Sequence, residues 1–213
     1  VGQVLVKLES SGICGAQINE IDAVKGNDNF LPHLLGHEGC GEVIECGPGV
    51  KYLNPGNKVV MHWRKGLGID SVPPKYSSKS LGIVNSGWVT TFNEYAVVSE
   101  NRLTAVPDNL NKDYAALMGC AITTALGTLT NDAKAKVGES IAIFGCGGVG
   151  LSLIQFAKLS GCFPIIGIDI HDNKLEHAVS LGATHTINAN KVGFEKSILK
   201  ANNGLNIDIC IDN

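Results

Sequence analysis

A glycine-rich hexamer, Gly145-Cys-Gly-Gly-Val-Gly150, offers the clearest chemistry in this sequence. It follows the apolar run Ile141–Phe144 and precedes a helical pattern, which is the order of a βαβ unit that binds a dinucleotide. In such a unit Gly145 makes the tight turn, Gly147 lets the backbone approach a pyrophosphate, and Gly150 lets the helix lie close to the sheet. Free amides at the start of the helix then favour an anion. The residues expected to contact the cofactor here are Gly145, Gly147, Gly148, Val149 and Gly150.

Asp169 ends a second apolar run, about 24 residues after Gly145, where a carboxylate can accept hydrogen bonds from an adenosine ribose diol. No arginine follows it in residues 170–174, so nothing there would neutralise a ribose 2′-phosphate. This favours NAD over NADP. The other interpretation, a glycine-rich turn that holds no nucleotide, stays open at this point.

Cysteine and histidine supply possible metal ligands at three separated places in the first half of the chain. These places are Gly12-Ile-Cys14-Gly, Gly36-His37-Glu-Gly and Met118-Gly-Cys120-Ala. A structural zinc usually draws on closely spaced Cys-x-x-Cys pairs, whereas a catalytic zinc takes three ligands from distant elements and leaves a fourth position open. The dispersed spacing therefore favours a catalytic metal.

The first half must position these ligands mainly with strands. Apolar alternation and Gly/Pro turns predict strands at Val4–Leu8, Glu42–Glu45, Lys58–Met61 and Asn93–Ser99. An Ala-rich helical pattern follows at Asp113–Leu129. We expect His62–Trp88, which holds several glycines and prolines, to form a long loop or lobe.

Strand and helix patterns alternate in the second half. We expect strands at 140–144, 165–170, 185–188 and 207–211, and helices at 149–160, 173–181 and 194–201. This alternation predicts a parallel sheet in the order 3-2-1-4, about four of the six strands of a doubly wound Rossmann sheet. The expected fold class is α/β, with a β-rich domain over 1–130 followed by a partial Rossmann domain over 131–213.

Five landmarks in this order resemble the zinc-dependent medium-chain alcohol dehydrogenases, which include polyol dehydrogenases. They are Gly12-Ile-Cys-Gly, Gly36-His-Glu-Gly-Cys-Gly-Glu-Val, Asn54-Pro-Gly-Asn-Lys-Val, Gly119-Cys120, and the glycine hexamer with Asp169. The resemblance covers nearly the whole chain. It implies that the β-rich domain is a GroES-like catalytic domain and that the sequence is truncated at both ends.

The resemblance also implies a ligand set and a reaction. Cys14, His37 and Cys120 would hold the zinc, and Glu38 would lie beside it as a transient ligand or a supporting group. The implied reaction transfers a hydride between an alcohol or polyol, or the matching carbonyl, and NAD.

Two further contacts are implied by the resemblance. Thr124, with its neighbour Thr123, lies within one helical turn of Cys120 and would contact the nicotinamide. Lys174 would contact the adenosine ribose, although a solvated position on its helix explains this lysine equally well.

Three departures from the family pattern concern proton transfer and metal affinity. Ala16 and Asn19 stand where many members carry a hydroxyl and a histidine that relay the proton, and neither titrates near pH 7. Gln17 stands where the family usually has an aspartate that orients the histidine ligand, so we expect reduced metal affinity.

A further departure concerns the number of metal sites. Many members hold a structural zinc with four closely spaced cysteines, but no cysteine lies between Cys46 and Cys120 here. We therefore expect at most one zinc, with the segment His62–Trp88 in place of that lobe at the substrate entrance.

Composition limits the partners. The chain has 213 residues, 44% of them hydrophobic, and a formal net charge of −3, so it has no field that would attract nucleic acid or anionic lipid. No apolar stretch is long enough to span a bilayer. Seven scattered cysteines indicate thiols in a reducing compartment. We expect a cytoplasmic protein that binds a small-molecule substrate and forms a homodimer.

Two other interpretations stay open. The chain could be a catalytically silent fragment that binds zinc and perhaps nucleotide without turnover. It could also be a zinc-free quinone reductase of the same superfamily, although Cys14 and Cys120 argue against that group, which typically lacks the cysteine ligands.

Overall fold

The structure is a computed structural model that describes residues 1–213, and it divides into two compact units, Val1–Cys120 and Ala121–Asn213. Each unit is described by itself. The assignment of a catalytic domain to 1–130 and a cofactor domain to 131–213 concerns function and stays a prediction.

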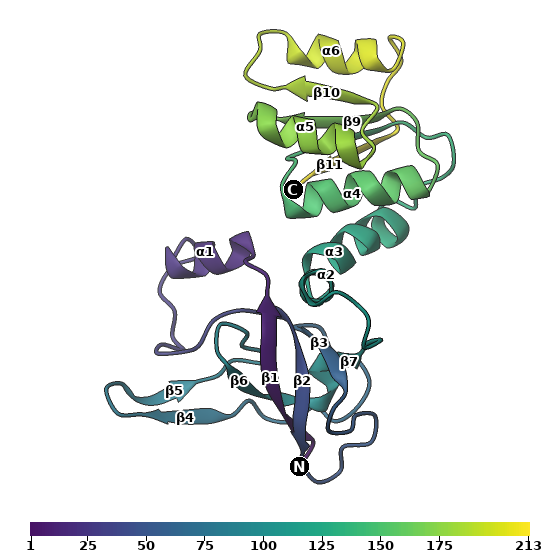
Figure 1. The fold of residues 1–213 in the computed structure, drawn as a ribbon. Coiled ribbons are helices and arrows are strands. Elements are labelled where there is room, and N and C mark those ends of the chain that lie inside the picture. The colour runs from purple at the N-terminus through teal and green to yellow at the C-terminus, as the bar shows by residue number, and fades with distance from the viewer. The chain divides into compact units, whose positions relative to one another are not determined.

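The first unit is built on a five-stranded antiparallel sheet in the order β6-β1-β2-β3-β7 (Figure 1). Alternate side chains of the first strand, such as Val4 and Val6, are fully buried, which is why a period-two pattern forms a strand there. The core against this face includes Val59, Met61 and Val98. The strands are β1 (Gln3–Ser11), β2 (Glu38–Cys46), β3 (Lys58–His62), β6 (Tyr95–Ser99) and β7 (Leu103–Ala105).

The segment expected to form a long loop or lobe contains an antiparallel hairpin, β4 (Lys75–Ser78) and β5 (Gly82–Asn85). These residues are strands rather than loop. The backbone amide of Val97 donates to the Tyr76 hydroxyl at 3.0 Å, which ties the hairpin to β6. A contact between distant segments produces no periodic pattern of apolar residues in the local sequence, so sequence patterns do not predict it.

The helical pattern expected over Asp113–Leu129 is confirmed for most of its length but is interrupted once. The structure has α2 (Lys112–Leu117) and α3 (Ala121–Gly127), followed by a π-helical turn, η2 (Thr128–Asp132). The helix breaks around Gly119, where a Cβ atom would lie 2.3 Å from the Met61 carbonyl oxygen. Close approach of the backbone to β3, rather than low helix propensity, explains the break. The other helical elements of the first unit are α1 (Gly15–Ile21) and the 3₁₀ turn η1 (Glu100–Arg102).

The second unit holds a parallel sheet in the order β10-β9-β8-β11, which is the predicted order 3-2-1-4. Its strands are β8 (Ile141–Phe144), β9 (Ile165–Asp169), β10 (His185–Asn188) and β11 (Ile209–Asp212). Its helices, besides α3, are α4 (Gly148–Leu159), α5 (Asp172–Leu181) and α6 (Phe194–Ala201). The expected α/β fold class is confirmed.

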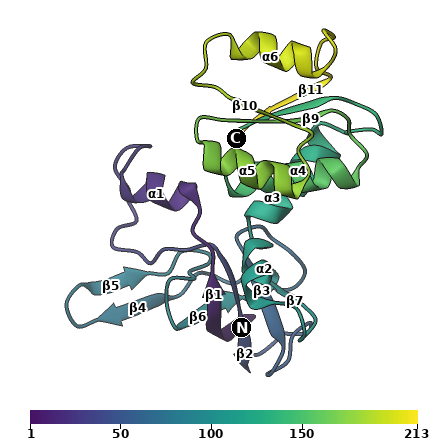
Figure 2. The same cartoon turned by 45° about the horizontal axis from the view of Figure 1, so that its top comes forward.

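Helices cover both faces of the parallel sheet, with α4 and α5 on one side and α6 on the other (Figure 2). Side chains of β8 alternate between them, because Ile141 and Ile143 pack with α4 while Ala142 packs toward α6. This two-sided burial explains why the strands read as continuous apolar runs.

No helix of either unit combines the length and the apolar character that crossing a bilayer requires.

Gly150 gives a test of how tightly α4 lies on the loop before it. A Cβ atom there would lie 1.8 Å from the Gly145 carbonyl oxygen, so Gly150→Ala should lower the free energy of unfolding by at least about 1–3 kcal/mol. Gly148→Ala is the matched control, because its Cβ atom would meet nothing within 4 Å. Urea unfolding followed by circular dichroism measures both variants, and equal midpoints would contradict the packing described.

Candidate metal centre and nucleotide-binding loop

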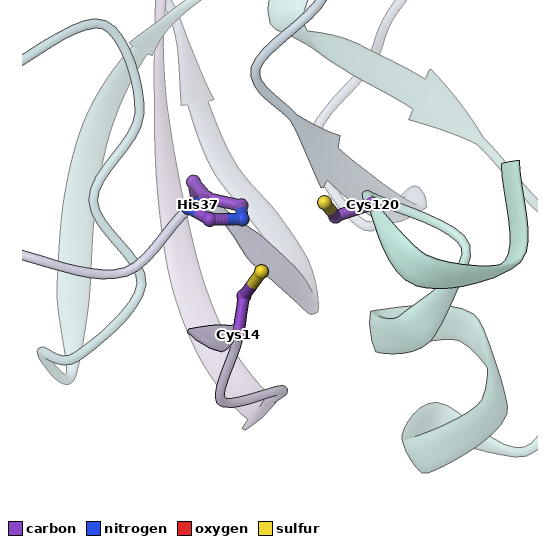
Figure 3. Close-up of side chains that lie close together, drawn as sticks. All are labelled: Cys14, His37 and Cys120. Atoms are coloured by element: carbon purple, nitrogen blue, oxygen red, sulfur yellow. The ribbon is translucent and has the colours of Figure 1, made fainter. Parts of the chain in front are cut away.

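The three cysteine and histidine motifs meet in the first unit. One ligand atom each from Cys14, His37 and Cys120 lies within 4.8 Å of the others, and all three residues are half-buried (Figure 3). Cys14 is the residue before α1, His37 precedes β2, and Cys120 follows α2. Segments far apart in sequence thus converge as the dispersed spacing predicted.

Backbone pairing at the ends of β1 and β2 brings Cys14 beside His37. The amide of Gly12 donates to the Glu38 carbonyl at 3.1 Å, and the Ser11 hydroxyl donates to the same oxygen at 3.2 Å. These bonds extend the antiparallel register past Ser11 and fix the chain where it leaves the sheet. The position of Cys14 therefore follows from the sheet itself.

Gly119 brings Cys120 to the same place. A side chain at this position would collide with the Met61 carbonyl and would also lie 2.9 Å from the Glu38 Cα atom. Only glycine lets this part of the chain approach β2 and β3 so closely.

The turn that carries His37 is held by Gln17. Gly36 has φ +91° and donates its amide to the Gln17 side-chain oxygen, while the Gln17 amide group donates to a Glu20 carboxylate oxygen at 2.8 Å. Sequence reasoning identified Gln17 only as a departure from a family pattern. The structure gives it a definite task, which is to link α1 to the histidine turn.

Burial lowers the pKa of His37, and the nearby Glu20 carboxylate opposes this shift only in part. Burial thus favours the neutral imidazole, which is the form that binds a metal ion.

Glu38 is 2% exposed and begins β2 next to His37. Its carboxylate reaches back to β1, because a Cβ atom on Gly12 would lie 2.5 Å from a Glu38 carboxylate oxygen. Its role beside the metal stays a prediction.

The donor set fits zinc. Zinc binds thiolate at about 2.3 Å and imidazole at about 2.0–2.1 Å, so a tetrahedral ion spaces such ligands about 3.5–3.8 Å apart. The three atoms, all within 4.8 Å of one another, reach that spacing with small side-chain adjustments.

The glycine hexamer, residues 145–150, forms an open loop and the first turn of α4, which together we call the cradle. Gly145 turns the chain with φ +89° and donates its amide to the Ile168 carbonyl at 2.8 Å. A Cβ atom on Gly147 or Gly148 would meet nothing within 4 Å, so the space above the start of α4 is open. This is the space that a pyrophosphate would need.

Asp169 ties the cradle to β9. Its carboxylate accepts hydrogen bonds from the Cys146 amide at 2.8 Å and the His171 amide at 2.9 Å, and the Lys174 ammonium lies 3.8 Å away. Burial alone would raise the pKa of Asp169, but these amides and Lys174 together hold it below its usual value. Each oxygen keeps acceptor capacity for a further hydroxyl.

The carboxylate of Asp169 faces a hollow of the second unit. A cavity of about 350 Å³ is lined by Gly145, Asp169, His171 and Lys174 among others. The structure thus brings Asp169 and Lys174 together with the glycine loop. Thr124, half-buried in α3, belongs to the second unit, and its contact with a nicotinamide stays a prediction.

Comparison with known proteins agrees with this geometry. Residues 1–108 match the family model described as the alcohol dehydrogenase GroES-like domain, and residues 148–213 match the zinc-binding dehydrogenase model. Similar curated proteins include S-(hydroxymethyl)glutathione dehydrogenases from Escherichia coli O1:K1 and Paracoccus denitrificans, each 32% identical. These alignments cover 89% and 88% of this chain but 58% and 56% of the relatives, so the chain spans less than two thirds of their length.

Solved structures agree as well. A benzyl alcohol dehydrogenase from Acinetobacter calcoaceticus is 27% identical with a TM-score of 0.85, and covers 100% of this chain and 63% of that one. A zinc-dependent alcohol dehydrogenase 2 from Streptococcus pneumonia is 28% identical with a TM-score of 0.80, over 98% of this chain and 61% of that one. The chain therefore belongs to the zinc-dependent medium-chain alcohol dehydrogenase family, as its five sequence landmarks predicted.

Proposed function

We propose that this protein is a zinc-dependent oxidoreductase that transfers a hydride between an alcohol or polyol, or the matching carbonyl, and NAD. The observation that carries the proposal is the convergence of Cys14, His37 and Cys120. When bound, zinc supplies a Lewis acid for the substrate oxygen, and the nicotinamide supplies a hydride acceptor or donor.

The two cysteines set the charge of the metal centre. As thiolates, Cys14 and Cys120 contribute two negative charges and the neutral His37 contributes none, so the ligands offset the charge of a divalent ion. The same two sulfurs argue against a zinc-free quinone reductase, which would have no need to hold them together.

The proton released from an alcohol has no side-chain relay at the two positions where the family often has one. Ala16 and Asn19 are both exposed on α1 and cannot titrate near neutral pH. The proton would therefore leave through water, the cofactor ribose or another side chain, or oxidation would be slow.

Asp169 supports NAD as the cofactor. Its carboxylate, kept ionised by two backbone amides, lies in the hollow beside the glycine loop, where it would accept from a ribose diol and repel a 2′-phosphate. Lys174 would contribute a donor to the same ribose. The homodimer and the cytoplasmic location expected from the sequence stay predictions.

The thiolate ligands can be tested by spectroscopy. Cobalt bound to the chain should give the intense charge-transfer absorption of a cobalt–thiolate bond, and Cys14→Ser should weaken this absorption strongly because one of two sulfur donors is lost. Cys210→Ser, which changes an exposed cysteine outside the centre, is the control. An absorption that Cys14→Ser leaves unchanged would exclude this metal centre.

The cradle can be tested by nucleotide binding. Gly147→Ala places a methyl group in the open space above the loop, so it should weaken NAD binding at least about tenfold, or roughly 1.4 kcal/mol. The unfolding midpoint should not change, because the methyl group meets no atom of the chain within 4 Å. Calorimetry measures the affinity for NAD. Equal affinities of the wild type and Gly147→Ala would show that the pyrophosphate does not bind above this loop.

The activity is tested with the zinc-loaded protein, NAD and a panel of primary alcohols, secondary alcohols and polyols. We expect NADH formation that is lost in Cys120→Ser and weaker with NADP. If zinc and NAD both bind and no alcohol is oxidised, the chain is the silent binding fragment and the proposed reaction is wrong for it.

A further inference from the structure

A second cluster of metal-binding side chains lies in the first unit, apart from the cysteines. One ligand atom each from Glu20, Asp28 and His33 lies within 4.8 Å of the others. Glu20 is on α1, Asp28 is in the segment after it, and His33 lies in the stretch before the histidine turn. The side chain of His33 is only 10% exposed.

The three side chains aim their ligand atoms at one another. His33 Nε2 lies 2.7 Å from Asp28 Oδ2 and 3.4 Å from Glu20 Oε1. The ion pairs that the structure shows for these two carboxylates go to this imidazole, with no lysine or arginine in the cluster. Two negative charges therefore share a single titratable partner.

The second polar atom of each of these three side chains already has a hydrogen-bond partner. His33 Nδ1 lies 2.8 Å from the Leu34 carbonyl oxygen, Asp28 Oδ1 accepts from the Phe30 amide at 2.7 Å, and Glu20 Oε2 accepts from the Gln17 amide group at 2.8 Å. Such outer contacts orient metal-binding imidazoles and carboxylates.

The hydrogen bond from Nδ1 determines what can lie between these groups. Because Nδ1 donates its proton to a backbone carbonyl, Nε2 of a neutral imidazole directs a lone pair at two carboxylate oxygens. That arrangement is repulsive unless a proton or a metal ion lies between them.

The spacing suits an ion. A zinc ion that binds oxygen and nitrogen at about 2.0–2.2 Å keeps neighbouring ligands about 3.3–3.5 Å apart. The separation of 3.4 Å between His33 and Glu20 already has this value, and the 2.7 Å separation from Asp28 would open by about 0.6 Å.

There is also room for the remaining coordination positions. A cavity of about 480 Å³ is lined by Glu20, Asp28 and His33, together with Phe30, Pro73 and Trp88 among others. Three protein ligands beside a cavity leave a position for water or another oxygen ligand.

We propose that Glu20, Asp28 and His33 form a second site for a divalent metal ion of the zinc class, in which the ion replaces the proton between His33 and the two carboxylates. The ion joins α1, the segment after it and the stretch that leads to His37. The expectation of at most one zinc was based on the cysteines alone. It did not include a site whose donors are oxygen and nitrogen atoms.

Metal stoichiometry tests this site separately from the cysteine centre. Zinc added to the metal-free chain should bind with two equivalents, measured by elemental analysis after gel filtration. Glu20→Gln and His33→Ala should each remove one equivalent and leave the cobalt–thiolate absorption unchanged. Cys14→Ser should remove the other equivalent and leave this one.

Asp22→Asn is the matched control, because it removes the same charge from an exposed residue directly after α1 and should keep both equivalents. Glu20 is the more exposed member of the cluster, so Glu20→Gln tests the site even if His33→Ala unfolds the chain. The proposal is wrong if the wild type binds one equivalent only, if Glu20→Gln keeps both, or if Asp22→Asn loses the second equivalent as readily, which would indicate an adventitious ion only.

Discussion

The antiparallel pairing of β1 with β2 is the constraint on which the candidate metal centre depends. Cys14 lies shortly after the end of β1 and His37 directly before the start of β2, and the bonds from Gly12 and Ser11 to the Glu38 carbonyl hold these two places together. A backbone hydrogen bond contributes only about 1 kcal/mol net, but a register shift by one residue would turn every side chain of β1 to the other face. The ligand positions are therefore as well defined as the hydrophobic core beneath them, which includes Val6 and Met61.

In both units a glycine lets the backbone approach another segment more closely than a side chain would allow. The consequence differs from one glycine to the next. At Gly119 it lets Cys120 reach the other ligands, and at Gly150 it brings the first turn of α4 against the Gly145 carbonyl. At Gly147, in contrast, a Cβ atom would meet no other atom of the chain within 4 Å. The first two glycines are needed for packing, whereas the third leaves open the space in which we propose that the pyrophosphate binds.

Sequence patterns predicted the elements whose cause is local. The parallel sheet followed from regular alternation of strands and helices, and its order was correct because right-handed crossovers leave few alternatives. The ligand set is predicted from landmarks shared with a family, and the three side chains that it names lie within 4.8 Å of one another. The patterns failed where distant contacts accompany the structure: at the helix break, Gly119 lies against the Met61 carbonyl, and the β4–β5 hairpin is linked to β6 through Tyr76. The burial of His33 is of the same kind, because its partners Glu20 and Asp28 share no periodic spacing with it.

The hydrogen bond between Gln17 and Glu20 bears on the choice of residue at position 17. A carboxylate on a side chain of the same length at residue 17 would lie about as close to Glu20 as the amide does, at 2.8 Å. Two like charges at that distance near a surface repel by several kcal/mol, on the order of 332/(εr) with an effective ε of about 20. An amide avoids this cost, because its oxygen accepts from Gly36 while its nitrogen donates to Glu20. The substitution at residue 17 is therefore not simply the loss of an orienting group. The amide is compatible with an acidic residue on α1 beside the histidine turn, and the other oxygen of that residue, Glu20, lies 3.4 Å from His33 Nε2.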